Sequence, residues 1–79
     1  MLYWRAMQLP EKALRALEVI RRDGRGVRFE IKTACEQERW RLKACYPATD
    51  DGEVQLGLLW SDDRAGLEAL MRKLEEECG

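Results

Sequence analysis

The sequence predicts an α+β fold of two layers, in which a three-stranded antiparallel meander carries two helices on one face. Three patterns lead to this fold: helical spacing of apolar residues over 10–23, alternation with a period of two over 27–60, and helical spacing again over 61–78. With 79 residues the chain is expected to form a single domain with a small core. Residues 1–9 are expected to form an arm or a short strand.

The first helix is predicted over 10–23. Pro10 is a favoured first helical residue, and Gly24 is a favoured residue just past a helix end. Arg21 and Arg22 suit the negative C-terminal end of the helix. One apolar stripe would face the core, formed by Ala13, Leu14, Leu17 and Ile20.

The strands are predicted from the alternation that follows Gly26, with turns at 36–38 and 50–52. The core side of the sheet would carry Val27, Phe29, Ile31, Thr33, Trp40, Leu42, Ala44, Tyr46, Leu56, Leu58 and Trp60. Both tryptophans of the sheet are therefore expected in the core rather than as stacking platforms for bases.

The register of the third strand, predicted over 53–60, depends on the turn before it. A two-residue turn at Asp51-Gly52 would set Ala44 opposite Leu59 and mix the two faces. A three-residue loop with a left-handed Gly52 keeps the faces apart, so we predict that register. Its pairs are Leu42 with Trp60, Ala44 with Leu58 and Tyr46 with Leu56.

The second helix is predicted from about Asp62 to Glu77. Ser61 is a good N-cap residue, and Asp62 and Asp63 would fill the first turn, where negative charge is favoured. The buried face would consist of Leu67, Leu70, Met71, Leu74 and Cys78.

Charge is divided unevenly along the chain. Residues 1–45 hold eleven Lys or Arg and six Asp or Glu, while residues 46–79 hold three and nine, so the halves carry +5 and −6. The solvent face of the sheet would carry five cations and one anion, about +4 in total. Its cations form a candidate binding face: Arg28, Lys32, Arg39, Arg41 and Lys43. The alternative is that they are simply solvated, because alternation places polar residues outside.

An acidic contact patch is the second candidate surface, formed by Asp62, Asp63, Glu75, Glu76 and Glu77. Helix-start chemistry and a solvated helix end account for the same residues without a partner.

Catalytic and metal chemistry find no support in the residue pattern. The chain has no histidine, no paired nucleophile and base, and no cofactor motif, so we expect no enzyme, no metal and no cofactor. Cys35, Cys45 and Cys78 are odd in number and far apart, which indicates reduced thiols. No apolar run reaches the length needed to span a bilayer, and residues 1–7 do not follow the pattern of a secretory signal. We therefore expect a cytoplasmic protein.

The order α-β-β-β-α is similar to that of double-stranded-RNA-binding domains and of small toxin ribonucleases. The binding domains imply a basic start of the second helix, where this chain has Ser61-Asp62-Asp63-Arg64, and the toxin enzymes imply a catalytic histidine, which it lacks. The resemblance therefore extends to topology alone.

These observations favour a small non-catalytic protein-binding module, of the kind that regulates or inhibits a larger complex in phages and mobile elements. The small core, the unpaired edge strands and the opposite charges of the two halves also predict a homodimer. The alternative is a nucleic-acid-binding module that uses the basic face of the sheet on phosphates.

Overall fold

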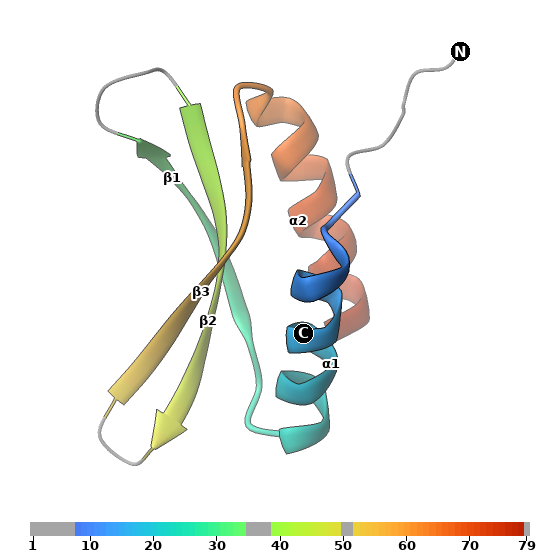
Figure 1. Cartoon of the computed structure of the whole chain (residues 1–79), viewed down its shortest axis with the longest axis vertical. Coiled ribbons are helices and arrows are strands. Elements are labelled where there is room, and N and C mark those ends of the chain that lie inside the picture. The colour runs from blue at the N-terminus through green and yellow to red at the C-terminus, as the bar shows by residue number, and fades with distance from the viewer. Residues whose placement is uncertain (1–7, 35–38, 50–51, 79) are drawn as a thin grey trace.

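The computed structural model of the chain describes residues 8–34, 39–49 and 52–78. They form, in order, α1 (Glu11–Asp23), β1 (Arg28–Ala34), β2 (Arg39–Thr49), β3 (Gly52–Ser61) and α2 (Arg64–Cys78). The strands make one antiparallel sheet in the order β1-β2-β3, and both helices lie against the same face of it (Figure 1). The predicted α+β architecture is confirmed. We call the other side of the sheet, which no described helix covers, the open face.

Helix α1 starts one residue later than predicted, because Pro10 is its N-cap residue with an extended backbone (φ −57°, ψ 149°). At the other end, Gly24 adopts the left-handed conformation (φ 72°) that a glycine tolerates without strain. Its N–H donates to the Arg21 carbonyl at 3.2 Å.

The buried face of α1 is narrower than the predicted stripe. Ala13, Leu17 and Ile20 are buried, but Leu14 is 49% exposed because it lies roughly 100° around the helix from Ala13. Leu9 joins the core ahead of the helix. The first seven residues of the predicted arm lie outside the described residues.

Strands β1 and β2 pair as the alternation predicts. Phe29 lies opposite Ala44 and Ile31 opposite Leu42, on the side that faces the helices. On the open face, Lys32 lies directly opposite Arg41, which is a like-charge pair. The turn predicted at 36–38 lies outside the described residues.

A β-bulge interrupts the pairing of β2 with β3. Leu42 pairs with Leu59, but the next residue, Lys43, pairs with Gly57, so Leu58 has no partner of its own. Beyond an extra residue of this kind, the residues of the strand that would face the core turn to the open face, and the reverse. Leu58 is buried and Leu59 packs against the core, so the following residue turns to the open face.

The predicted register of β3 is therefore wrong. It placed Trp60 in the core and Leu59 outside, whereas Trp60 lies on the open face with 47% of its surface exposed. The observed pairs are Leu42 with Leu59, Ala44 with Leu56 and Tyr46 with Val54. The predicted left-handed conformation of Gly52 is also wrong. Gly52 has no positive φ, and it pairs with Thr49 as the first residue of β3.

Helix α2 begins at Arg64, and Asp63 caps it instead of Ser61. The N–H of Gly66 donates to Oδ1 of Asp63 at 3.0 Å, while the N–H of Asp63 donates to Oγ of Ser61 at 2.9 Å. Ser61 is not the cap because it is the last residue of β3, three residues before α2 begins. Asp62 and Asp63 consequently precede the helix and do not lie in its first turn, contrary to the prediction.

The core lies between the sheet and the helices. Leu67 of α2 is fully buried there, together with Leu42 of the central strand, and Leu74 is nearly so. Leu70, Met71 and Cys78 pack against it from the predicted face of α2. Across the described ranges, neither helix is long and apolar enough to span a membrane.

Candidate binding surface

All five predicted basic residues lie on the open face. β1 carries Arg28 and Lys32, and β2 carries the other three, Arg39, Arg41 and Lys43. Among the described residues, two carboxylates share this face, since Glu53 of β3 joins Glu30 there. Five cations and two anions leave +3, and the structure divides them into two regions with different partners.

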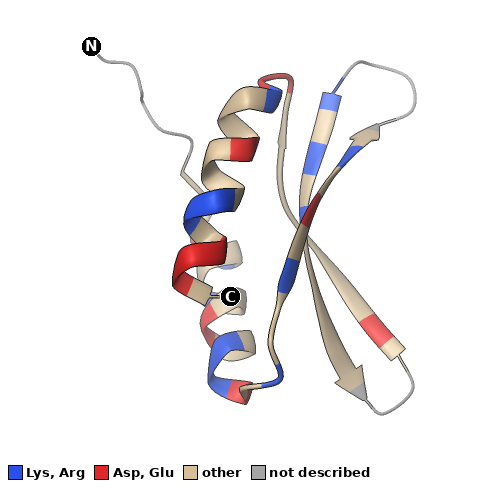
Figure 2. Ribbon diagram, turned by 180° about the vertical axis from the view of Figure 1, so that it is seen from behind, with Lys and Arg blue, Asp and Glu red and all other residues tan. Residues whose placement is uncertain are grey.

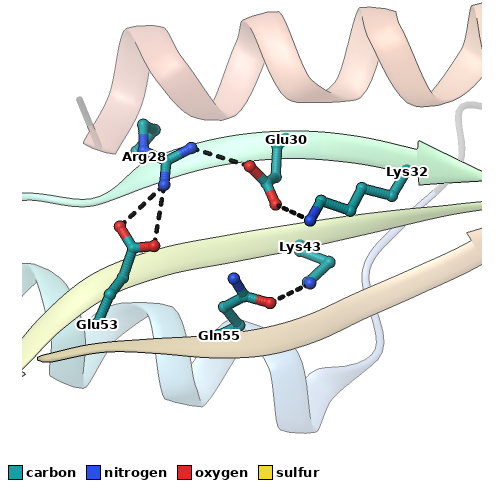
Figure 3. Close-up of polar contacts among 6 residues, drawn as sticks. All are labelled: Arg28, Glu30, Lys32, Lys43, Glu53 and Gln55. Carbon is teal, nitrogen blue, oxygen red and sulfur yellow. Dashed lines mark hydrogen bonds and ion pairs between the residues drawn. The ribbon is translucent and has the colours of Figure 1, made fainter.

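The first region is an ion-pair network at the Arg28 end of the sheet (Figure 3). Nη2 of Arg28 donates to both carboxylate oxygens of Glu53, at 2.9 and 3.0 Å, and Nη1 donates to Oε2 of Glu30 at 2.9 Å. Lys32 Nζ lies 3.4 Å from the other Glu30 oxygen. The hydrogen bond to Glu53, and after it the one to Glu30, raise the pKa of Arg28. The hydrogen bond from Arg28 lowers the pKa of Glu30.

A buried thiol lies beside this network. Cys45 lies on the open face in the same row as Arg28 and Gln55, yet only 1% of it is exposed. Arg28 on β1 reaches Glu53 on β3 across the central strand, and Lys43 hydrogen-bonds to Gln55 in the neighbouring row. Burial raises the pKa of the Cys45 thiol. We call these residues the covered region: Arg28, Glu30, Lys43, Cys45, Glu53 and Gln55.

The second region centres on Trp60. The Arg41 guanidinium lies over the indole, with Cζ 5.4 Å from the ring centroid, which is cation–π geometry. The Arg41 side chain fits there because residue 57 is a glycine: a Cβ at Gly57 would lie 2.6 Å from Arg41 Nε and 2.9 Å from Arg41 Cζ. The Nε of Arg41 is buried and finds no hydrogen-bond partner among the described residues.

Two more cations flank this pair. Lys32 lies opposite Arg41, and Arg39, two residues earlier on β2, is exposed. Within the described ranges Arg39 takes part in no ion pair. We call Lys32, Arg39, Arg41 and Trp60 the Trp60 patch. It combines an exposed aromatic ring with three cations, of which Lys32 also forms an ion pair with Glu30 of the covered region. In the covered region, Arg28 is paired with two carboxylates.

The acidic candidates are not brought together. Asp62 and Asp63 precede α2, and Glu75, Glu76 and Glu77 lie in its last turn, roughly 20 Å away at 1.5 Å per residue (Figure 2). All five side chains are exposed. Asp62 and Asp63 instead lie close to the Trp60 patch, since Ser61 pairs with Trp40 at the end of the sheet.

The sequence indicated the cations of the open face but not the two partners that organise them, Trp60 and Glu53. Trp60 was missed because the bulge at Leu58 was missed. Gly57 was the available signal, since an isolated glycine inside a strand often marks a bulge or a close approach. Glu53 was missed because its partner, Arg28, lies on β1, with β2 between the two strands.

Thiols and carboxylates provide no metal site in the part of the chain that the structure describes, where no three such groups cluster. Cys45 and Cys78 are free thiols, and Cys35 lies outside the described residues. Comparison with protein-family models, with curated proteins and with solved structures finds no match to this chain.

Proposed function

We propose that the chain is a non-catalytic protein-binding module and that the Trp60 patch is its contact surface. The observation that carries this proposal is a tryptophan, 47% exposed, held by an arginine on an open sheet face. Tryptophan and arginine are the residue types most enriched where binding energy concentrates in protein interfaces. An indole in this position loses unfavourable contact with water when a partner covers it.

Arg41 is held in place before any partner arrives. Its guanidinium packs on the Trp60 ring and fills the space above Gly57. A side chain that is already ordered loses less conformational entropy on binding. Arg41 is therefore suited to meet a carboxylate of a partner protein with its terminal N–H groups.

The non-catalytic part of the proposal rests on the residues present. The chain has no histidine for general acid–base catalysis. The thiol of Cys45 is buried with a raised pKa, whereas a nucleophilic cysteine is exposed with a lowered one. That the module regulates or inhibits a larger complex stays a prediction from its size and composition.

Nucleic-acid binding is the second candidate, and Trp60 is the observation that favours it. An exposed ring beside cations is the arrangement on which single-stranded bases stack. Two features count against nucleic-acid binding. The Arg41 guanidinium lies over one face of the ring, where a base would stack. Asp62 and Asp63 lie beside the patch and repel phosphates. Protein binding therefore ranks first.

The test compares the proteins that co-purify with tagged wild type and with Trp60→Ser and Arg41→Gln variants after nuclease treatment. Val19→Ser is the matched control, because Val19 is 66% exposed but lies on α1, away from the patch. We expect the two patch variants to lose a partner that the control keeps. Equal recovery by all four proteins would contradict the proposal.

A second measurement addresses the alternative function. Salt-dependent binding of wild type to single-stranded RNA or duplex DNA, with a slope of about −0.7 to −0.9 per phosphate contact and loss in Trp60→Ser, would assign the patch to nucleic acid instead. We expect no binding to either at about 100 mM salt.

A further inference from the structure

We propose that a second copy of the chain covers the Trp60 patch, in a dimer whose two-fold axis passes close to Trp60. The inference rests on the proposed function and names the protein partner of that same surface. It goes beyond a general expectation of dimerisation, because it identifies the residues in contact and their charges.

Charges of opposite sign flank Trp60 at one end of the molecule. Arg41 pairs with Trp60 across β2 and β3, and Lys32 pairs with Arg41, so cations extend from the ring toward β1. In the chain direction, Ser61 and then Asp62 follow the ring. Figure 2 shows the acidic connection before α2 at the same end of the molecule as the basic start of β2.

A dimer with a two-fold axis would bring these opposite charges of two copies together. In such a dimer the same surface of both copies meets, so a contact from residue i to residue j is repeated from j to i. With the axis near Trp60, the cations of one copy lie toward Asp62 of the other, and the two indole rings meet between them. A surface with cations alone would instead repel its own copy.

Asp62 is the carboxylate that this contact requires. It is exposed, and among the described residues it accepts no hydrogen bond, whereas Oδ1 of Asp63 is occupied by the Gly66 N–H that it caps. Arg39 is its counterpart, since it is exposed and forms no ion pair with the described residues.

The other acidic group does not fit a closed dimer. Glu75, Glu76 and Glu77 lie at the far end of α2, in the layer opposite the open face. If they met the Trp60 patch of a second copy, the contact would be head-to-tail and would continue into a filament unless the rotation closed into a ring. Charge complementarity within one end of the molecule therefore favours the two-fold pair.

The experiment is sedimentation equilibrium of the full chain from about 1 to about 100 μM, the range in which weak dimers dissociate. The wild type is expected to shift from the monomer mass of 9.2 kDa toward twice that value. Arg39→Glu and Asp62→Arg should each weaken self-association by at least about tenfold, since each places like charges together twice. Trp60→Ser should weaken it as well.

A mixture of the two charge variants gives the sharpest readout. In the mixed dimer, Glu at 39 of one copy meets Arg at 62 of the other, and the original Arg39 and Asp62 still meet on the other side of the axis. The mixture and the double variant should therefore associate again, close to wild-type strength. This recovery also shows that both variants are folded.

Matched charge reversals away from the patch serve as controls. Lys12→Glu on α1 and Glu75→Arg at the end of α2 alter the same charges at exposed positions, and both should dimerise as the wild type does. A wild type that stays at monomer mass up to about 100 μM, or a dimer that both patch variants retain, would overturn the inference. In either case the proposed function stands if another protein still requires Trp60, so the two failures are distinguishable.

Discussion

The guanidinium of Arg28 on β1 bonds both carboxylate oxygens of Glu53 on β3, at 2.9 and 3.0 Å, across the central strand. On β2, Cys45 is the partner of Arg28 and Pro47 is the partner of Glu53, so the ion pair runs diagonally past Cys45. The Cys45 side chain is almost fully buried although it lies on the open face. An ion pair between exposed groups stabilises a fold little. Because the pair lies beside the buried Cys45, we expect it to keep water and reagents away from the thiol.

The first prediction follows from this cover. Replacing Glu53 by Ala removes the group that holds Arg28 across β2, so Cys45 should react several-fold faster with a thiol reagent. The measurement is the rate of labelling by a disulfide reagent in a background where Cys35 and Cys78 are serine. Glu75→Ala is the control, and an unchanged rate for Glu53→Ala would show that other atoms cover Cys45.

The second prediction separates the two orientations of Trp60. Because about half of its ring is exposed on the open face, Trp60→Ser should lower the free energy of unfolding by about 1–2 kcal/mol, from the lost cation–π contact and the part of the ring that is covered. Leu67→Ala, at a fully buried position, should lower it by about 2–5 kcal/mol. Urea unfolding at low protein concentration measures both. Equal losses would place Trp60 in the core.

The third prediction concerns the space above Gly57. Gly57→Ala should displace the Arg41 guanidinium from the indole, since an added Cβ would lie 2.6 Å from Nε. The upfield ring-current shift of the Arg41 side-chain protons, measured by NMR, should then decrease toward that of Trp60→Ser. Gly52→Ala is the matched control in the same strand, because a Cβ at Gly52 meets nothing within 4 Å. A shift retained in Gly57→Ala would mean that Arg41 rests elsewhere.

The fourth prediction is a pH dependence. The hydrogen bond from Arg28 lowers the pKa of Glu30 below its ordinary value of 4.5. A carboxyl whose pKa is lower in the folded state stabilises the fold above its unfolded pKa, and this stabilisation is lost as the pH falls through the folded pKa. Between pH 4.5 and the folded pKa, wild type should therefore lose more stability than Glu30→Gln does.

Thermal unfolding across this acid range is the measurement. Glu18→Gln is the control, because Glu18 is exposed on α1 and forms no ion pair with the described residues. Parallel curves for wild type and Glu30→Gln would contradict a role of Glu30 in acid sensitivity.

Local patterns were sufficient to predict the elements and their order. Helix α1 follows from its apolar spacing and from Gly24, which ends it, and β1 and β2 follow from alternation in which Phe29 and Leu42 face the helices. These signals are read within a few residues of the chain, where sterics and side-chain period act. The same alternation was sufficient to place all five cations on one face.

The tertiary structure decided what depends on pairing between strands. The bulge at Leu58 sets which of Leu59 and Trp60 is buried, and it is chosen by the fit of β3 to both β2 and the helices, which no local pattern encodes. The same holds for Glu53, whose partner lies two strands away. The sequence by itself therefore determined the fold and the basic face, and only the tertiary structure decided that an exposed Trp60 lies on that face and that Arg28 is neutralised there.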